Sequence, residues 1–154
     1  MLQGSRAFYL LSEFIKDSLL DTDGVNTVTY GDIERVDLSK QTLYPLSHIN
    51  VLNAVPQENQ IVFTFSVIAM DLVDISKEEV DDLFTGNDNE QDVLNTQCFV
   101  LSKLVAAIRR NRNVNNFELV GEPSLEPFTD RFDNLVAGWV LTFDISIAND
   151  IYLC

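Results

Sequence analysis

Apolar side chains occupy every second position from residue 137 to residue 147, and most positions between them are polar or small. Successive side chains of an extended strand point to opposite faces of a sheet, so this alternation predicts a strand with one buried face. The apolar positions are Ala137, Trp139, Leu141, Phe143, Ile145 and Ile147. The chain is therefore expected to contain a sheet that is covered on one side.

Residues 60–73 alternate in the same way, but both faces of this segment are apolar, which is typical of a central strand or of one covered twice. Residues 46–54 also alternate, and the stretch VPQENQ then interrupts the pattern with a proline. We expect these two segments to form a long antiparallel hairpin. Shorter strands are expected at residues 25–30 and 117–120.

Two other segments have the periodicity of amphipathic helices. In residues 7–20 the apolar stripe consists of Phe8, Leu11, Ile15 and Leu19. In residues 89–112 the expected stripe consists of Leu94, Cys98, Leu101, Val105 and Ile108, with Val100 and Leu104 beside it. The order of elements predicts an α+β fold, with two main helices packed on one face of an antiparallel β-sheet that contains the long hairpin. A chain of 154 residues is interpreted as one domain, residues 1–154.

The chain is strongly acidic, with 24 Asp and Glu against 10 Lys and Arg and a net charge of −14. Such a surface repels phosphate, which argues against specific nucleic-acid binding and against an anionic membrane as a partner. The longest apolar stretch, residues 61–70, is far shorter than the roughly 20 residues of a membrane span. Two isolated cysteines, Cys98 and Cys154, form neither a disulfide framework nor a zinc site and indicate a reducing, cytosolic environment.

No catalytic constellation is visible in the sequence. His48 is the single histidine, which excludes mechanisms that need two, and its place on an alternating strand predicts a histidine on the sheet surface. The stretch DTDGVN starts like an EF-hand loop, but Gly24 comes too early and Asp32 stands where such a loop has glutamate. A turn that ends the first helix is therefore favoured. We expect no enzyme activity, no catalytic residues, no cofactor and no metal.

The acidic stretch at residues 71–92 supports an alternative function. It contains nine carboxylates and one lysine, and carboxylates that repel one another attract a hard cation. The chain would then be a cytosolic acidic cation-binding module, or a small enzyme that uses this loop. The spacing matches no calcium-loop template, so a solvated acidic connection is the favoured interpretation.

The stretch PFTDRFDNLVAGW, residues 127–139, concentrates rings and charges. Phe128 and Phe132 are spaced as on a helical turn, and Arg131 is flanked by two aspartates. We therefore interpret the stretch as a structural corner in front of the last strand, not as a catalytic loop. Aromatic residues and arginine are enriched at protein interfaces, so Phe128, Arg131, Phe132 and Trp139 are the candidate interface residues.

Three segments of the chain together resemble small virion proteins of tailed bacteriophages, most of all those of Bacteroidetes hosts, including the crAss-like group. They are NFELVGEPSLEPFTDRFDNLVAGWVLTFDISI at residues 116–147, NDNEQDVLNTQCFVLSKLVAAI at residues 87–108, and VTYGDIERVDLSKQTLYPLSHINVLNAVPQENQIVFTFSVIAMD at residues 28–71. The family is that of neck and tail-completion proteins, or tail-terminator-like ring proteins. These motifs are structural, and no active-site residues come with them.

The resemblance implies a structural virion protein in the neck or tail, at the head–tail connection, that is assembled in the host cytoplasm. Its partners would be further copies of itself in a ring, six or twelve in number, and the adjacent portal, connector or tail proteins. DNA would pass through the ring without specific binding. The strong negative charge agrees with this expectation, because a lumen that repels phosphate lets DNA slide. Asp144 or the carboxylates of residues 71–92 are expected to line that channel.

Overall fold

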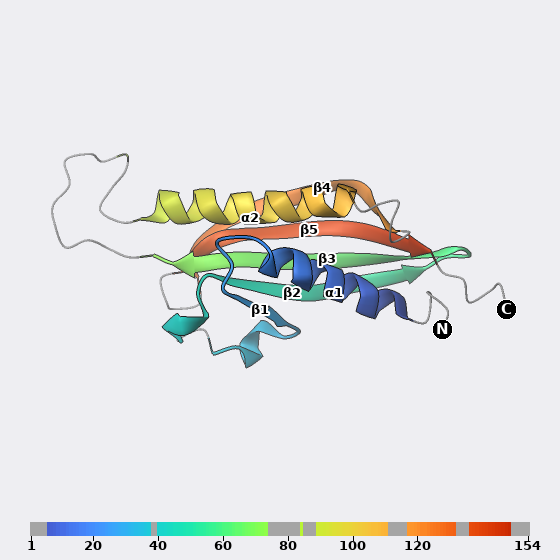
Figure 1. The fold of residues 1–154 in the computed structure, drawn as a ribbon, viewed down its shortest axis with the longest axis horizontal. Coiled ribbons are helices and arrows are strands. Elements are labelled where there is room, and N and C mark those ends of the chain that lie inside the picture. Colours follow the sequence, from blue (N-terminus) through green and yellow to red (C-terminus); the bar gives the residue numbers. More distant parts are fainter. Residues whose placement is uncertain are drawn as a thin grey trace.

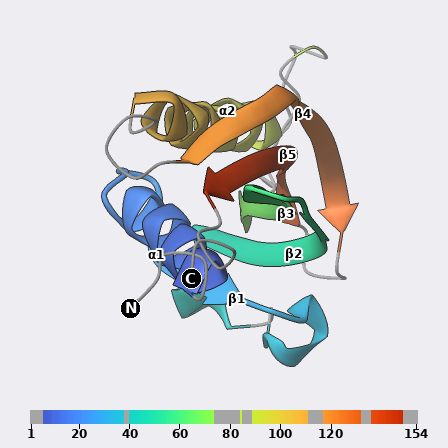
Figure 2. The same ribbon diagram turned by 90° about the vertical axis from the view of Figure 1, so that its right-hand side faces the viewer.

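The computed structural model describes residues 6–37, 40–73, 84, 89–110, 117–131 and 136–148. Its elements are α1 (Ala7–Leu20), β1 (Thr27–Tyr30), η2 (Ile33–Arg35), η3 (Gln41–Leu43), β2 (Leu46–Pro56), β3 (Gln60–Leu72), α2 (Glu90–Arg110), β4 (Phe117–Arg131) and β5 (Val136–Ala148). Five strands form one sheet in the order β1-β2-β3-β5-β4, and both α-helices lie on the same face of it (Figures 1 and 2). The fold is α+β, as the alternating and helical periodicities predict.

The main core lies between the helices and the sheet. The odd-numbered residues of β3 and β5 point into it, and Phe65 of β3 stacks on its register partner Phe143 of β5 at a centroid distance of 5.8 Å. Helix α1 contributes the residues Ala7, Leu11, Ile15 and Leu19, which follow a spacing of four. The predicted stripe of α1 is confirmed at three of its positions, while Phe8 is only partly buried at the edge of the core.

Helix α2 turns a slightly different side to the sheet than its sequence predicts. Its buried residues are Val93, Gln97, Val100, Leu101, Leu104 and Ile108. Leu101 and Ile108 were expected in this stripe, but Leu94, Cys98 and Val105 are only partly buried. The observed stripe therefore runs through Gln97, a polar residue that hydrophobic periodicity passes over.

One strand pairing differs from the expected antiparallel sheet, because β1 runs parallel to β2. The connection between these strands, residues 31–45, is long enough to return the chain to the starting end of the sheet, as parallel pairing requires. The amides of Asn26 and Thr27 both donate to the carbonyl of Pro45, which fixes the start of β1 beside the start of β2. The β2–β3, β3–β5 and β4–β5 pairs are antiparallel, and β2–β3 is the predicted long hairpin.

Strand β4 is much longer than the segment 117–120 that its sequence predicts. It continues through Pro127 and Phe128 to Arg131, so the expected corner with a helical turn at residues 127–131 is wrong. Proline is tolerated on an edge strand, and β4 is an edge of this sheet. A register shift between Val120 and Ser124 contains Gly121 at φ 71°, so a bulge interrupts the alternation on which the shorter prediction rested.

Candidate functional site

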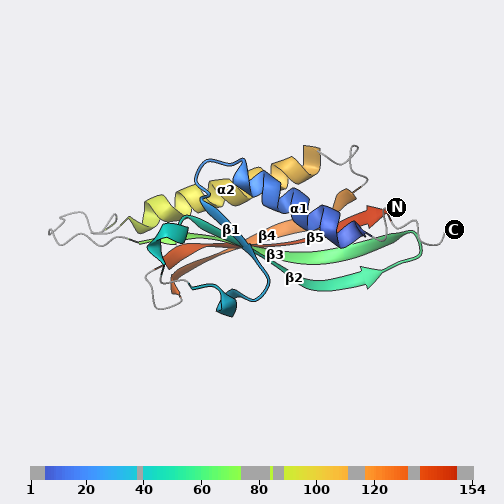
Figure 3. The ribbon, with the colours of Figure 1, turned by 60° about the horizontal axis from the view of Figure 1, so that its bottom comes forward.

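The sheet face opposite the helices is covered by neither α1 nor α2 (Figure 3). We call it the open face. Even-numbered residues of the central strands lie on it, together with their register partners on β2 and β4. It consists of Asn50, Asn53, Val55, Val62, Thr64, Ser66, Glu118, Val120, Ser124, Glu126, Val140, Thr142, Asp144 and Ser146. Three of these residues are carboxylates, and none is Lys or Arg.

Asp144 lies at the centre of the open face. The hydroxyl of Thr64, its register partner on β3, donates to Asp144 Oδ1 at 2.5 Å. Ser146 Oγ donates to the carbonyl of Glu118 on the neighbouring strand at 3.4 Å. A short hydrogen bond from a neutral hydroxyl stabilises a carboxylate without neutralising it, so Asp144 presents a fixed negative charge on this face.

One end of the same sheet face is covered by the connection between β1 and β2. A small core forms there from Tyr44, Leu46, Met70 and Val136, with partly buried residues of η2, η3 and β4 around it. The open face is therefore polar over most of its length and closed by an apolar cluster at the end where β2 begins.

His48 is buried under this connection, so the expected histidine on the sheet surface is wrong. Its Nε2 lies 2.7 Å from the carbonyl oxygen of Gly31, and its Nδ1 lies 2.7 Å from Thr29 Oγ1. Because a carbonyl can only accept, Nε2 carries the proton and Nδ1 accepts from the hydroxyl. Burial lowers the pKa of His48 below its usual 6.5, although the bond to Gly31 and the charge of Asp32 act in the opposite direction. His48 is therefore neutral and connects β2 to the end of β1 through these two hydrogen bonds.

Two of the four candidate interface residues are placed on opposite sides of the sheet. Trp139 packs against the main core, and its Nε1 donates to the carbonyl oxygen of Leu94 on α2 at 2.8 Å. Phe128 packs against the small core at the covered end, where its register partner is Gly138. The two rings therefore do not share one surface, and each has a role within the fold.

Other predicted site residues lie outside the described part of the chain. This applies to Phe132, to the side chain of Arg131, and to residues 74–83 and 85–88 of the acidic stretch. The described members of that stretch, Asp71 in β3 and Glu90 and Asp92 in the first turn of α2, belong to regular elements. Within the described ranges, no three His, Cys, Asp or Glu side chains come together in a way that could hold a metal ion.

A groove between α1 and the edge of the sheet has a volume of about 360 Å³. We call it the α1–β1 groove. It is lined by Phe8, Tyr9, Ser12, Glu13 and Lys16 of α1 and by Val28, Thr29, Tyr30 and Ile49 of the sheet. The ring of Phe8 contacts Tyr30 edge to face at 6.0 Å and stacks on Phe65 at 6.2 Å, so the wall is rigid and aromatic. Sequence periodicity does not predict this groove, because its residues come from separate elements.

Charged groups frame this groove at Tyr9. The guanidinium of Arg6 lies 5.2 Å from the centroid of the Tyr9 ring. A hydrogen bond to Glu13 and the negative charge of Glu13 raise the pKa of Tyr9 above its usual value. With Lys16 on the lining, the groove has two cations and one carboxylate in a chain with a net charge of −14.

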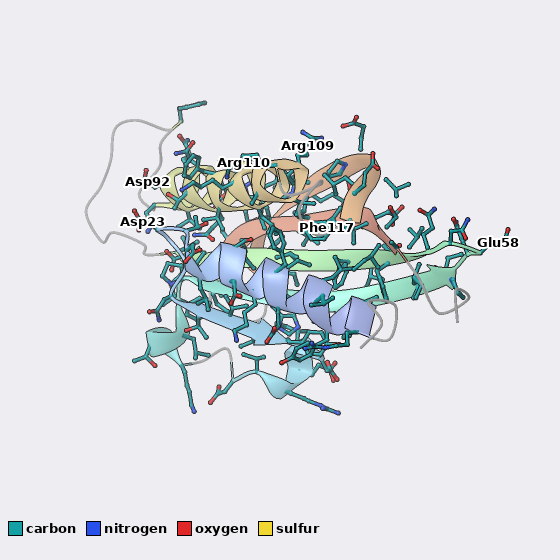
Figure 4. All side chains as sticks on the ribbon, turned by 45° about the vertical axis from the view of Figure 1, so that its right-hand side comes forward. Asp23, Glu58, Asp92, Arg109, Arg110 and Phe117 are labelled. Atoms are coloured by element: carbon teal, nitrogen blue, oxygen red, sulfur yellow. The ribbon has the colours of Figure 1, made fainter. Side chains whose placement is uncertain are left out.

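The end of the β2–β3 hairpin projects beyond both helices (Figures 1 and 3). Residues 52–59, the hairpin tip, are all exposed. The strands of the tip remain paired as far as Pro56 and Ile61, and the amide of Gln57 donates to the carbonyl of Gln60 at 2.7 Å. Figure 4 shows Glu58 at its far end. The tip is therefore an ordered element that no other part of the described chain covers.

Gln97 is a buried residue that the sequence did not single out. It is only 1% exposed, and neither its Nε2 nor its Oε1 has a hydrogen-bond partner. Ser47 Oγ on the helix-facing side of β2 is buried in the same way. Both residues occupy positions of the main core, and the one signal for Gln97 was its spacing of four from Val93 and Leu101.

None of the helices in the described part of the chain combines enough length and apolarity to cross a membrane. No protein-family model matches the sequence, and no curated protein is similar to it. The surfaces of the chain itself therefore carry the functional argument.

Proposed function

We propose that this chain is a structural virion protein of a tailed bacteriophage, which forms an oligomeric ring in the neck or tail and keeps a channel open for DNA. The proposal combines the resemblance of the sequence to neck and tail-completion proteins with the shape and charge of the fold. Its role is mechanical: copies pack side by side, one rim of the ring contacts the portal or connector, and the other contacts the tail.

The observation that carries this proposal is the open face. It is long, polar and rich in hydroxyl groups, and its described side chains include Glu118, Glu126 and Asp144 but no lysine or arginine. DNA is bound mainly through its phosphates by Lys and Arg, so a wall without cations does not retain it. We propose that the open face lines the channel and that the helices face outward.

The first test is assembly. Light scattering and negative-stain microscopy of the purified chain, alone and mixed with the portal protein of the same phage, should show closed rings in at least one sample. A chain that remains monomeric in both samples, and that binds to no portal ring, would refute the proposed function.

The second test addresses the channel wall. Ser124→Lys with Ser146→Lys adds two cations to the open face, whereas Asn95→Lys with Ser102→Lys adds two cations to exposed positions of α2. At low salt, we expect rings of the first variant to retain DNA and rings of the second to release it like the unmodified chain, because only the first places cations along the DNA path. Equal retention by both variants would refute the assignment of the open face to the channel.

A further inference from the structure

We infer that copies of this chain join head to tail, with the hairpin tip of one copy seated in the α1–β1 groove of the next. The inference rests on the proposed function only because a ring supplies the second copy. The tip and the groove are different surfaces, so the contact is heterologous and generates a ring or a filament.

The hairpin tip carries apolar side chains that no other part of the described chain covers. Leu52, at the register shift of β2, is 56% exposed, and Val55 is 46% exposed. Fixing the backbone of a protruding hairpin costs conformational entropy. Leu52 and Val55 remain in contact with water, so they contribute no hydrophobic stabilisation that would offset this cost. A partner that covers these two residues supplies the missing stabilisation.

The α1–β1 groove offers a complementary surface for such side chains. Tyr9 and Tyr30 are about half exposed at its mouth, at 52% and 54%, and the Phe8 ring forms its floor. Tyrosine is enriched among residues that dominate binding energy, because it buries a large rigid ring and keeps a polar edge in water. The groove is also large enough for two aliphatic side chains of the tip.

Charge identifies the occupant as a second copy. Two copies with a net charge of −14 each repel one another except where a cation of one meets a carboxylate of the other. Glu58 is the single charged residue of the tip, and the cations Arg6 and Lys16 lie at the groove. Glu13 is also at the groove, so the two cations leave it with an excess of one positive charge, opposite in sign to Glu58.

The tip does not reach the groove of its own chain. The hairpin continues past α1 in the direction of its strands, and the groove lies between α1 and β1 on the side of the sheet (Figures 1 and 4). Asn53 and Val55, at the end of the open face, belong to the hairpin tip and take part in this contact. The rest of the proposed channel wall, including Asp144, stays uncovered in a head-to-tail assembly of this kind.

The test measures self-association of the full-length chain by sedimentation velocity over a range of concentrations. Leu52→Ser with Val55→Ser should weaken self-association at least tenfold, as expected when buried interface anchors are lost. Leu20→Ser with Val120→Ser is the matched control, because these residues have the same side chains and are 46% and 43% exposed. The control should associate like the unmodified chain.

Charge reversal tests the orientation of the contact. At low salt, Glu58→Lys alone and Lys16→Glu alone should each weaken self-association by about three- to tenfold, and a mixture of the two variants should recover it. Asp17→Lys changes the net charge by +2, as Glu58→Lys does, but lies outside the groove and should not weaken self-association.

Cross-linking identifies the contact directly. In a background of Cys98→Ser and Cys154→Ser, a mixture of Val55→Cys and Tyr30→Cys chains should form a disulfide-linked dimer of unlike chains on oxidation. Rings that persist in the Leu52→Ser, Val55→Ser variant would overturn the inference and leave the proposed function standing. A full-length chain that never self-associates would also overturn the inference, whereas the proposed function is then decided by assembly on the portal protein.

Discussion

Gly138 lies near the start of β5, where the backbone of β3 leaves no room for a side chain. Its register partner is Met70, and a Cβ added to Gly138 would lie 2.9 Å from the carbonyl carbon of Ala69 and from Cα of Met70. It would come closer still to the carbonyl oxygen of Ala69. All of these atoms belong to backbone, so no side-chain rotation can relieve the contact.

The cost of Gly138→Ala follows from this geometry. Ordinary contacts begin at 3.4 Å, so the two strands must separate by at least 0.5 Å, from 2.9 to 3.4 Å, and by more at the oxygen. Overpacking of this kind costs about 1–3 kcal/mol, and each weakened ladder hydrogen bond adds about 1 kcal/mol. We expect Gly138→Ala to lower the free energy of unfolding by about 3 kcal/mol, a large share of the stability of a typical domain.

Gly121→Ala provides the matched control in the same sheet. Gly121 has φ 71°, which L-residues rarely adopt, but no atom lies within 4 Å of its added Cβ. Its replacement should therefore cost about 1 kcal/mol from backbone conformation alone. Urea unfolding monitored by circular dichroism and by the fluorescence of Trp139, the single tryptophan, measures both variants. If Gly138→Ala costs no more than Gly121→Ala, the close approach of β3 and β5 is refuted.

Two further predictions concern buried polar groups. Gln97→Met should raise the free energy of unfolding by about 1–3 kcal/mol in urea titrations, because it removes two buried polar atoms without partners, and a loss of stability would instead reveal a partner for the amide. Burial lowers the pKa of His48 in the folded chain. As the pH falls below about 6.5, His48 therefore binds a proton in the unfolded chain before it does so in the folded chain. Stability should therefore fall between pH 7.5 and roughly pH 5.5, and His48→Gln should flatten this slope; an unchanged slope in that variant would contradict the assignment.

Periodicity predicted the elements whose burial repeats regularly. Helix α1 has the expected bounds, strand β3 differs from expectation by one residue at its end, and β5 differs by one residue at each end, since hydrophobic burial determines which side these strands turn inward. Strand β4 could not be predicted in full, because an edge strand is buried on one side at most and a bulge at Gly121 shifts its alternation. The parallel pairing of β1 depends on a connection of irregular structure, which has no periodic signal.

The candidate surfaces could be predicted from the sequence less well than the fold. The stretch PFTDRFDNLVAGW attracted attention because its rings and charges are close in sequence, yet Phe128 and Trp139 lie on opposite faces. The strand register explains this outcome. Phe128 on β4 is the partner of Gly138 on β5 and lies on the same face as Gly138, whereas the next residue, Trp139, points to the opposite face. The groove at Tyr9 and Tyr30 combines α1 with β1, and only tertiary structure brings them together.

Charge restricts how identical copies of this chain can meet. Among its described side chains the open face carries carboxylates and no lysine or arginine, so pairing two open faces would bring Glu118, Glu126 and Asp144 against the same groups of a second copy. Such a two-fold contact is unfavourable, because like charges would be desolvated together. The described cations lie on α1 and α2 or beside them, and on the β1–β2 connection at one end of the open face, so favourable contacts between copies must involve one of these two places. A contact made through the cations of the helices leaves the acidic face uncovered, which is the condition that a wall facing DNA requires.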